Sequence, residues 1–152
     1  MNIADITIRL AEHSDSKNIW AWRNDSETRR NSNSEDEITW ENHCAWFDKS
    51  LLNENRRILI GINTDAGDAI GVVRFDLDTD GDSAEVSINL NPKWRGKGLC
   101  KPLLSSAIDA YSKEHVCVLD AYIKLPNIPS IKCFEHCGFT AHERGEERLR
   151  LR

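Results

Sequence analysis

The chain has 152 residues, of which 39% are hydrophobic and 30% charged, and its formal net charge is -5. This length fits a single domain, residues 1–152, and the composition is that of a globular rather than a disordered protein. The negative charge argues against nucleic acid as a partner, because phosphate binding requires a basic face. No apolar stretch is long enough to cross a bilayer, and the start of the chain lacks the basic and apolar regions of a secretory signal. We therefore expect a cytoplasmic protein without nucleic-acid or membrane partners.

Metal binding is not expected from the cysteines or from the acidic turn. The five cysteines have no CxxC spacing, so in a reducing compartment they indicate free thiols or small buried side chains: Cys44, Cys100, Cys117, Cys133 and Cys137. The possible metal ligands His115, Cys117, Cys133, His136 and Cys137 match no zinc pattern in their spacing. The segment Asp76-x-Asp78-x-Asp80-Gly81 begins like a calcium loop, but Ser87 stands where that loop needs glutamate.

Hydrophobic periodicity predicts the secondary structure in chain order. In the N-terminal half, the expected elements are a strand at 6–10, a helix that begins near Ser14 or Asp15 and runs through Trp22, a polar and mostly loop segment at 25–37 and a helix at 39–52. Beyond it, strands are expected at 57–62, 69–76 and 84–90, a helix at 98–113, a strand at 116–123, a helix at 130–137 and a strand from 139. Residues 146–152 alternate weakly and suggest a final strand. This order predicts a mixed α/β sheet with helices packed on it.

The most informative segment is 91–101, Asn-Pro-Lys-Trp-Arg-Gly-Lys-Gly-Leu-Cys-Lys, between an apolar strand and an amphipathic helix. Glycines let the backbone turn tightly, so that several N–H groups can point into one concavity. The start of the helix adds the positive end of its dipole, and a diphosphate is the natural ligand of such a site. By itself the pattern also describes a plain strand-to-helix turn. GxxxxGK[ST] and GxGxxG are both absent, which removes the main support for nucleotide hydrolysis and dinucleotide binding.

Two segments together carry a family resemblance. Arg95 to Cys100 resembles the (Q/R)xxGx(G/A) pyrophosphate loop of the GNAT superfamily of N-acetyltransferases, with Cys100 where glycine or alanine is usual. Residues 127–139 resemble that family's NxxSxxxYxxxGF segment. The resemblance covers essentially the whole chain. It implies a mixed, mostly antiparallel sheet with helices on both faces and a splay between strands 4 and 5. It also implies acetyl transfer from acetyl-CoA, as co-substrate, to a primary amine without a metal.

The resemblance also implies which residues contact acetyl-CoA. The backbone of Asn89 and Leu90 faces the thioester carbonyl, and Asn127 and Ser130 face the pantetheine arm. The cofactor-binding set is Asn89, Leu90, Arg95, Gly96, Lys97, Gly98, Leu99, Cys100, Lys101, Asn127 and Ser130.

Acetyl transfer to an amine needs a base to remove a proton from the nucleophile. Glu85, on strand 4, is the carboxylate that the resemblance places for this role, directly or through water, although a strand glutamate can also simply face solvent. Asp120, on strand 5, is the second candidate. Phe134 stands where many members carry a tyrosine that protonates the departing thiolate. Cys133, Ser130 or a water takes that role, or the thiolate leaves without help.

The N-terminal third indicates the acceptor. Residues 22–30, WRNDSETRR, and 38–47, ITWENHCAWF, resemble signatures of bacterial GNAT enzymes that acetylate the 4-amino group of nucleotide-linked amino sugars, as in the pseudaminic acid pathway. Guanidinium groups can clamp a diphosphate, and tryptophans can stack on a base or sugar, although each residue can equally be core or ion-paired. The substrate-binding candidates are Trp22, Arg23, Asn24, Arg30, His43 and Trp46.

Other functions remain open at this point. The same chemistry on a protein N-terminus, a polyamine or an aminoglycoside fits the resemblance. A GNAT-fold module that binds acyl-CoA without catalysis also fits, because Phe134 and Cys100 depart from the family pattern. Both a monomer and a homodimer are compatible with the sequence.

Overall fold

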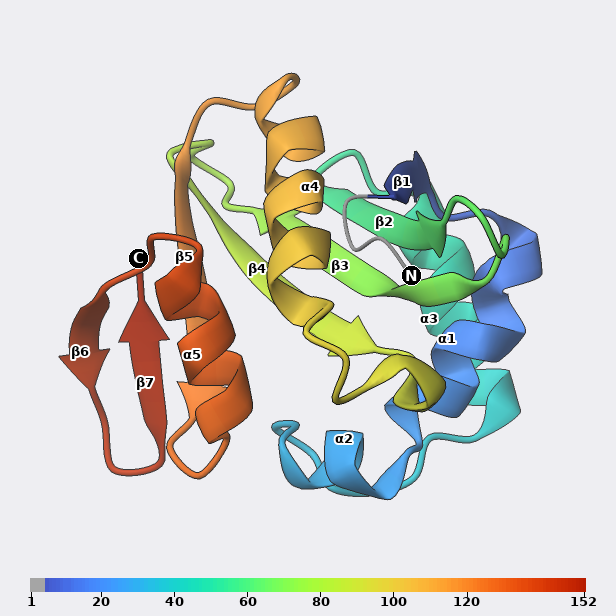
Figure 1. The fold of residues 1–152 in the computed structure, drawn as a ribbon, viewed down its shortest axis with the longest axis horizontal. Helices are drawn as coiled ribbons and strands as arrows, with labels where there is room; N and C mark the ends of the chain where they lie inside the picture. Colours follow the sequence, from blue (N-terminus) through green and yellow to red (C-terminus); the bar gives the residue numbers. More distant parts are fainter. Residues whose placement is uncertain (1–4) are drawn as a thin grey trace.

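The protein is described by a computed structural model that covers residues 5–152 (Figure 1). Its seven-stranded sheet has the order β1-β2-β3-β4-β5-β7-β6. The strands are β1 (Ile6–Leu10), β2 (Arg56–Asn63), β3 (Ala69–Leu77), β4 (Ser83–Leu90), β5 (Val118–Lys124), β6 (Ala141–Arg144) and β7 (Arg148–Leu151). Neighbouring strands are antiparallel except β4 and β5, which are parallel. The mixed, mostly antiparallel sheet is therefore confirmed, including the final strand suggested by the alternation at 146–152.

Helices cover both faces of the sheet, as expected. They are α1 (Ser16–Arg23), α2 (Ser26–Arg30), α3 (Trp40–Leu52), α4 (Cys100–Ser112) and α5 (Ile128–His136). Figure 1 shows α4 in front of β3 and β4, with α1 and α3 behind the sheet. The core on the α4 and α5 side includes Phe75, Leu103 and Phe134, and the core under α1 and α3 includes Trp22 and Phe47. In residues 5–152, no helix is both long and apolar enough to cross a bilayer.

The segment 25–37, expected to be mostly loop, also contains the short helix α2. Asp25 is its N-cap, and the carboxylate accepts a hydrogen bond from the backbone N–H of Thr28 at 3.2 Å. Such a cap satisfies an amide that the first turn leaves without a partner. The segment is still mostly loop, and the sequence did not reveal the helix at Ser26–Arg30 because a five-residue polar helix has no hydrophobic period to detect.

The parallel pairing of β4 and β5 is short. It consists of Ser83↔Val118, Ala84↔Leu119 and Glu85↔Asp120. β4 then continues to Leu90, whereas β5 pairs with β7 from Ala121 onward. The two strands therefore diverge after Glu85, which is the splay that the family resemblance implied.

Two facing glycines let α4 lie close to the sheet. Gly61 on β2 and Gly71 on β3 are paired across the strands. A Cβ on Gly71 would lie 2.7 Å from the Asn89 carbonyl oxygen and 3.0 Å from Cδ2 of Leu103. Leu103 is fully buried, and truncating such a side chain to alanine costs about 2–5 kcal/mol. This close packing fixes the position of α4, and hence of the loop before it, against β4.

Candidate active site

The loop between β4 and α4 is open where a ligand could approach its backbone. Gly96 and Gly98 have φ angles of 72° and 70°, a region that favours glycine because other residues are strained there. A Cβ at either position would have no neighbouring atom within 4 Å. The glycines therefore turn the chain twice and leave space beside it.

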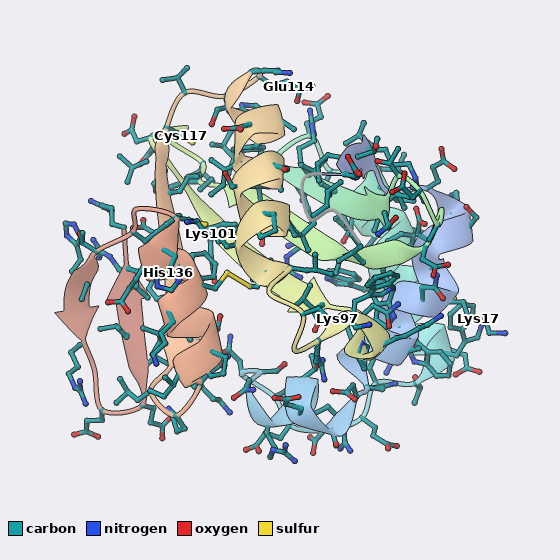
Figure 2. The ribbon with its side chains drawn as sticks, in the orientation of Figure 1. Lys17, Lys97, Lys101, Glu114, Cys117 and His136 are labelled. Atoms are coloured by element: carbon teal, nitrogen blue, oxygen red, sulfur yellow. A yellow bond between two sulfur atoms is a disulfide. The ribbon has the colours of Figure 1, made fainter. Side chains whose placement is uncertain are left out.

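The first turn of α4 adds hydrogen-bond donors and positive charge to this space. The N-cap, Leu99, makes no side-chain capping hydrogen bond, and the first amides of a helix have no partner inside it. Lys97 on the loop and Lys101 in the first turn are both exposed (Figure 2). Open backbone, free amides, a helix dipole and two ammonium groups together suit the diphosphate of acetyl-CoA. The binding of acetyl-CoA by residues 95–101 stays a prediction.

A disulfide links this turn to α5. Cys100 is bonded to Cys133 (Figure 2, yellow bond), so the expectation of free thiols was wrong for these two residues. Cys44, Cys117 and Cys137 are free. The pair was missed because 33 residues separate the two cysteines, and only the packing of α4 against α5 brings them together. While the bond is formed, Cys133 has no thiol proton to give to a leaving group.

Phe134 has no polar role in the site. It is 1% exposed, and its ring meets that of Phe139 edge to face at a centroid distance of 5.0 Å. The position therefore serves the core. Ser130, which is partly exposed at the first turns of α5, a water or an unassisted thiolate remains from the alternatives raised by the sequence.

Glu85 belongs to a row of charged side chains that crosses the sheet at the point of divergence. It is exposed and lies opposite Asp76 on β3 and Asp120 on β5. Asp76 accepts hydrogen bonds from Arg56 and Arg74. Asp120 is paired with Arg152. Arginines therefore already neutralise both carboxylates that lie next to Glu85.

The ion pair of Asp120 distinguishes it from Glu85. Arg152 donates to its two oxygens at 2.8 and 3.0 Å, and Arg150 lies 3.6 Å from one of them. The hydrogen bond from Arg152 lowers the pKa of Asp120, against the effect of burial. A carboxylate held in this way is a weak base. Within residues 5–152, Glu85 has no ion-pair partner.

Arg95 connects the cofactor loop to α2. Its guanidinium donates to Asp25 at 2.7 Å, to Glu27 at 3.0 Å and to the Thr28 hydroxyl at 2.8 Å. Thr28 in turn donates to Oδ1 of Asn89 at 3.1 Å. In this structure the Arg95 side chain therefore contacts α2 and its N-cap rather than the open side of the loop. These contacts position α2 beside the end of β4.

The other end of α2 reaches β5. Lys124 donates to the backbone carbonyl of Arg30 at 2.9 Å and lies 3.9 Å from Glu35. A pocket of about 390 Å³ lies here, lined by Glu27, Arg30, Asn31, Glu35, Lys124, Pro126, Asn127 and Pro129. It brings Arg30, expected to bind the acceptor, together with Asn127, expected to bind acetyl-CoA. Because α2 contacts the ends of both diverging strands, it borders the opening between them.

Three of the acceptor candidates serve mainly to hold the structure. Trp22 is 6% exposed in the core, and the Asn24 side chain both donates to and accepts from the backbone of Ile38 at 2.8 Å. His43 is fully buried, and its Nε2 donates to the carbonyl of Ser16 at 2.9 Å. Its other ring nitrogen lies 3.3 Å from the Arg23 guanidinium, so His43 positions Arg23.

Arg23 and Trp46 are partly exposed and lie together. The guanidinium carbon of Arg23 is 4.4 Å from the Trp46 ring centroid, and those of Arg56 and Arg74 are each 5.5 Å from it. The sequence did not single out Arg56 or Arg74. The alternation of β3 places Arg74 and Asp76 on one face, but it does not reveal that α1 and α3 add Arg23 and Trp46 to the same place.

Residues 5–152 contain no group of three or more histidine, cysteine or acidic side chains arranged to hold a metal ion.

The acetyltransferase (GNAT) domain model matches residues 5–140, and the chain belongs to the GNAT family of acetyltransferases. It is 31% identical over 139 residues to the Bacillus subtilis (strain 168) protein named "Putative phosphinothricin acetyltransferase YwnH", covering 88% of this chain and 83% of that one. Among solved structures, it resembles a spermidine N-acetyltransferase from Vibrio cholerae in complex with CoA and spermine. That likeness has a TM-score of 0.86 and 19% identity over 97% of this chain and 94% of the other, and it shows the fold alone. A crystal structure described as a putative phosphinothricin N-acetyltransferase has a TM-score of 0.78 and 26% identity, covering 96% and 94%. The chain is therefore an N-acetyltransferase that uses acetyl-CoA as its acetyl donor.

Proposed function

We propose that the protein acetylates the primary amine of a small molecule, with Glu85 as the general base. The observation that carries this proposal is the position of Glu85. It lies in the last residue pair before β4 and β5 separate, and it is the member of the charged row without an ion pair within residues 5–152. A carboxylate there is free to accept a proton, directly or through a water.

The chemistry requires little else from the side chains. Acetyl-CoA supplies an activated acetyl thioester when bound. Glu85 takes one proton from the acceptor ammonium, and the neutral amine nitrogen forms a bond to the carbonyl carbon. The carbon–sulfur bond then breaks, and the nitrogen loses its second proton to water or to the departing thiolate, which leaves a neutral amide. In this proposal, backbone N–H groups at the end of β4, near Asn89 and Leu90, stabilise the developing oxyanion. The thiolate leaves unassisted or takes a proton from Ser130 or water.

Further residues complete the proposed cofactor site. Gly96, Lys97, Gly98 and the first turn of α4 hold the diphosphate, and Asn127 and Ser130 contact the pantetheine arm. The Arg95 side chain contributes by positioning α2 through hydrogen bonds rather than by contacting the cofactor directly. The working enzyme is proposed to be a cytoplasmic monomer or homodimer.

The acceptor is proposed to be a nucleotide-linked amino sugar, on the resemblance of residues 22–30 and 38–47 to enzymes of that class. A second candidate is an amino acid of the phosphinothricin type, which the name of the Bacillus subtilis relative favours. Both candidates carry an amine and an anionic group.

An acceptor panel tests the proposal. Purified protein is incubated with acetyl-CoA and, in turn, a UDP-linked 4-amino sugar, phosphinothricin, spermidine and an N-terminal peptide, while release of the CoA thiol is followed. We expect thiol release with at least one amine and its loss in Glu85→Gln. CoA binding without thiol release from any of these amines would overturn the proposed acetylation of a small-molecule amine.

A further inference from the structure

Three arginines from three elements meet at one tryptophan. Arg23 ends α1, Arg56 starts β2 and Arg74 lies in β3, and all three guanidinium groups approach the ring of Trp46 on α3. We call Arg23, Arg56, Arg74 and Trp46 the Trp46 arginine cluster. All four side chains are partly buried, so the charges of the three arginines are less screened than those of surface residues.

The cluster carries more positive than negative charge. Arg56 and Arg74 share a single carboxylate, Asp76. Arg23 has no ion-pair partner within residues 5–152, and its contacts are with the His43 ring and the Trp46 face. Three cations against one anion leave an excess of two charges, or one if Glu85, which lies opposite Asp76, is counted. Burial, followed by repulsion from Arg74 and Arg56, lowers the pKa of Arg23.

A partly buried cation without a counter-ion is costly, so its presence needs a reason. Asp76 explains Arg56 and Arg74 as an ordinary ion-pair network. Asp76 does not neutralise Arg23, whose contacts with Trp46 and His43 keep its guanidinium close to those of Arg56 and Arg74. A guanidinium has five donors in a fixed geometry that suits the oxygens of phosphate, phosphonate, phosphinate or carboxylate groups. An anion at this place would supply the missing charge.

The cluster lies beside the proposed base. Arg74 is paired with Ser87 on β4, and Glu85 lies two residues before Ser87 on the same face of that strand. The Cα atoms of diagonal neighbours such as Arg74 and Glu85 are roughly 7–8 Å apart. An acceptor whose anionic group is a few bonds from its amine can therefore reach both the cluster and Glu85.

We propose that the Trp46 arginine cluster is the subsite that binds an anionic group of the acceptor, and that the enzyme selects amines carrying a phosphate, phosphonate, phosphinate or carboxylate over polyamines. This inference rests on the proposed acetyl transfer at Glu85. It deepens that proposal by assigning acceptor specificity to Arg23, Arg56 and Arg74, of which the sequence indicated only Arg23.

Two matched probes test the anion site directly. 3-Aminopropylphosphonate and n-butylamine both carry a primary amine on an alkyl chain, but only the first has an anion. Titration calorimetry should show binding of the phosphonate to the wild-type protein and its weakening by roughly 10–100-fold in Arg23→Gln, the effect of losing a hydrogen bond to a charged group. The same variant should leave the affinity for n-butylamine and for CoA unchanged.

Control variants separate charge from packing. Arg57→Gln removes a guanidinium from the neighbouring position of β2, where Arg57 pairs with Glu114 instead, and should bind the phosphonate like the wild type. Arg23→Lys keeps the charge and should recover part of the affinity. If Arg23→Gln proves unstable in thermal unfolding, Arg74→Gln repeats the test from a different element.

The outcomes distinguish the anion site from the acetyl transfer. Acetylation assays with phosphinothricin and with a UDP-linked 4-amino sugar identify the source of the anion, and kcat/KM for either should exceed that for spermidine. Phosphonate binding that depends on Arg23, without turnover of any amine, would support the anion site and overturn the catalytic proposal. Turnover that prefers spermidine, or equal affinity for phosphonate and n-butylamine, would overturn the anion site and leave acetyl transfer intact.

Discussion

Glu85 on β4 and Asp120 on β5 lie opposite each other in the last parallel pair before the two strands separate. Their environments differ because Arg152 holds both oxygens of Asp120, whereas Glu85 is exposed and has no ion pair within residues 5–152. The two carboxylates therefore have different roles. Asp120 holds β5 to the C-terminal strand pair, and Glu85 is the carboxylate that we propose as the base.

The first prediction follows from this difference. Glu85→Gln keeps the shape of the side chain but removes the base, so kcat for acetyl transfer should fall roughly 10²–10⁴-fold. The affinity for CoA should not change, because Glu85 lies away from the loop at 95–101. Steady-state kinetics and titration calorimetry measure the two effects. Glu146→Gln, in the exposed β6–β7 turn, is the control, and wild-type turnover in Glu85→Gln would remove Glu85 as the base.

The second prediction concerns the cofactor loop. Gly98→Trp should abolish measurable CoA binding because the indole fills the open space beside the loop. Gly81→Trp is a matched control. Gly81 also has a positive φ angle, 73°, and open surroundings, but lies in the β3–β4 turn. Both variants should lose a similar stability of roughly 1–2 kcal/mol from backbone strain, measured by urea unfolding. Equal CoA affinity in the two variants would contradict the placement of the diphosphate.

The third prediction concerns the Cys100–Cys133 disulfide. It closes a chain segment of 33 residues, so reducing it should lower the free energy of unfolding by about 3–4 kcal/mol in the loop-entropy model. For a domain of this size, the corresponding fall in Tm is roughly 10 °C. Calorimetric scans with and without dithiothreitol measure it. The double variant Cys100→Ser, Cys133→Ser should have the Tm of the reduced wild type in both buffers. If dithiothreitol still lowers the Tm of this variant, the effect of the reductant does not come from the disulfide.

The sequence predicted those parts of the molecule that depend on local pattern. The alternation over 84–90 indicated β4, and the glycine spacing at 96 and 98 indicated the open loop, because each depends on neighbouring residues only. The Cys100–Cys133 bond and the Trp46 arginine cluster depend on helices and strands that meet only in the folded chain. α2 was missed for a related reason, since Arg95, about 70 residues away, supplies much of what holds it.

The last prediction is a pH dependence that arises from His43. Because its Nε2 donates to a carbonyl oxygen, its Nδ1 accepts from Arg23, and a second proton on the ring would face a cation. Burial, and then the charge of Arg23, lower the pKa of His43 below its usual 6.5. The unfolded chain therefore takes up this proton at a higher pH than the folded chain. The stabilising contribution of His43 is complete above about pH 6.5 and is lost as the pH falls toward the lower folded-state pKa.

We expect the free energy of unfolding to fall between pH 7.5 and 5.5 more steeply in the wild type than in His43→Gln, as measured by urea titrations at each pH. Parallel curves for the wild type and His43→Gln would mean that His43 takes up its proton equally in both states, and that its contact with Arg23 does not keep it neutral.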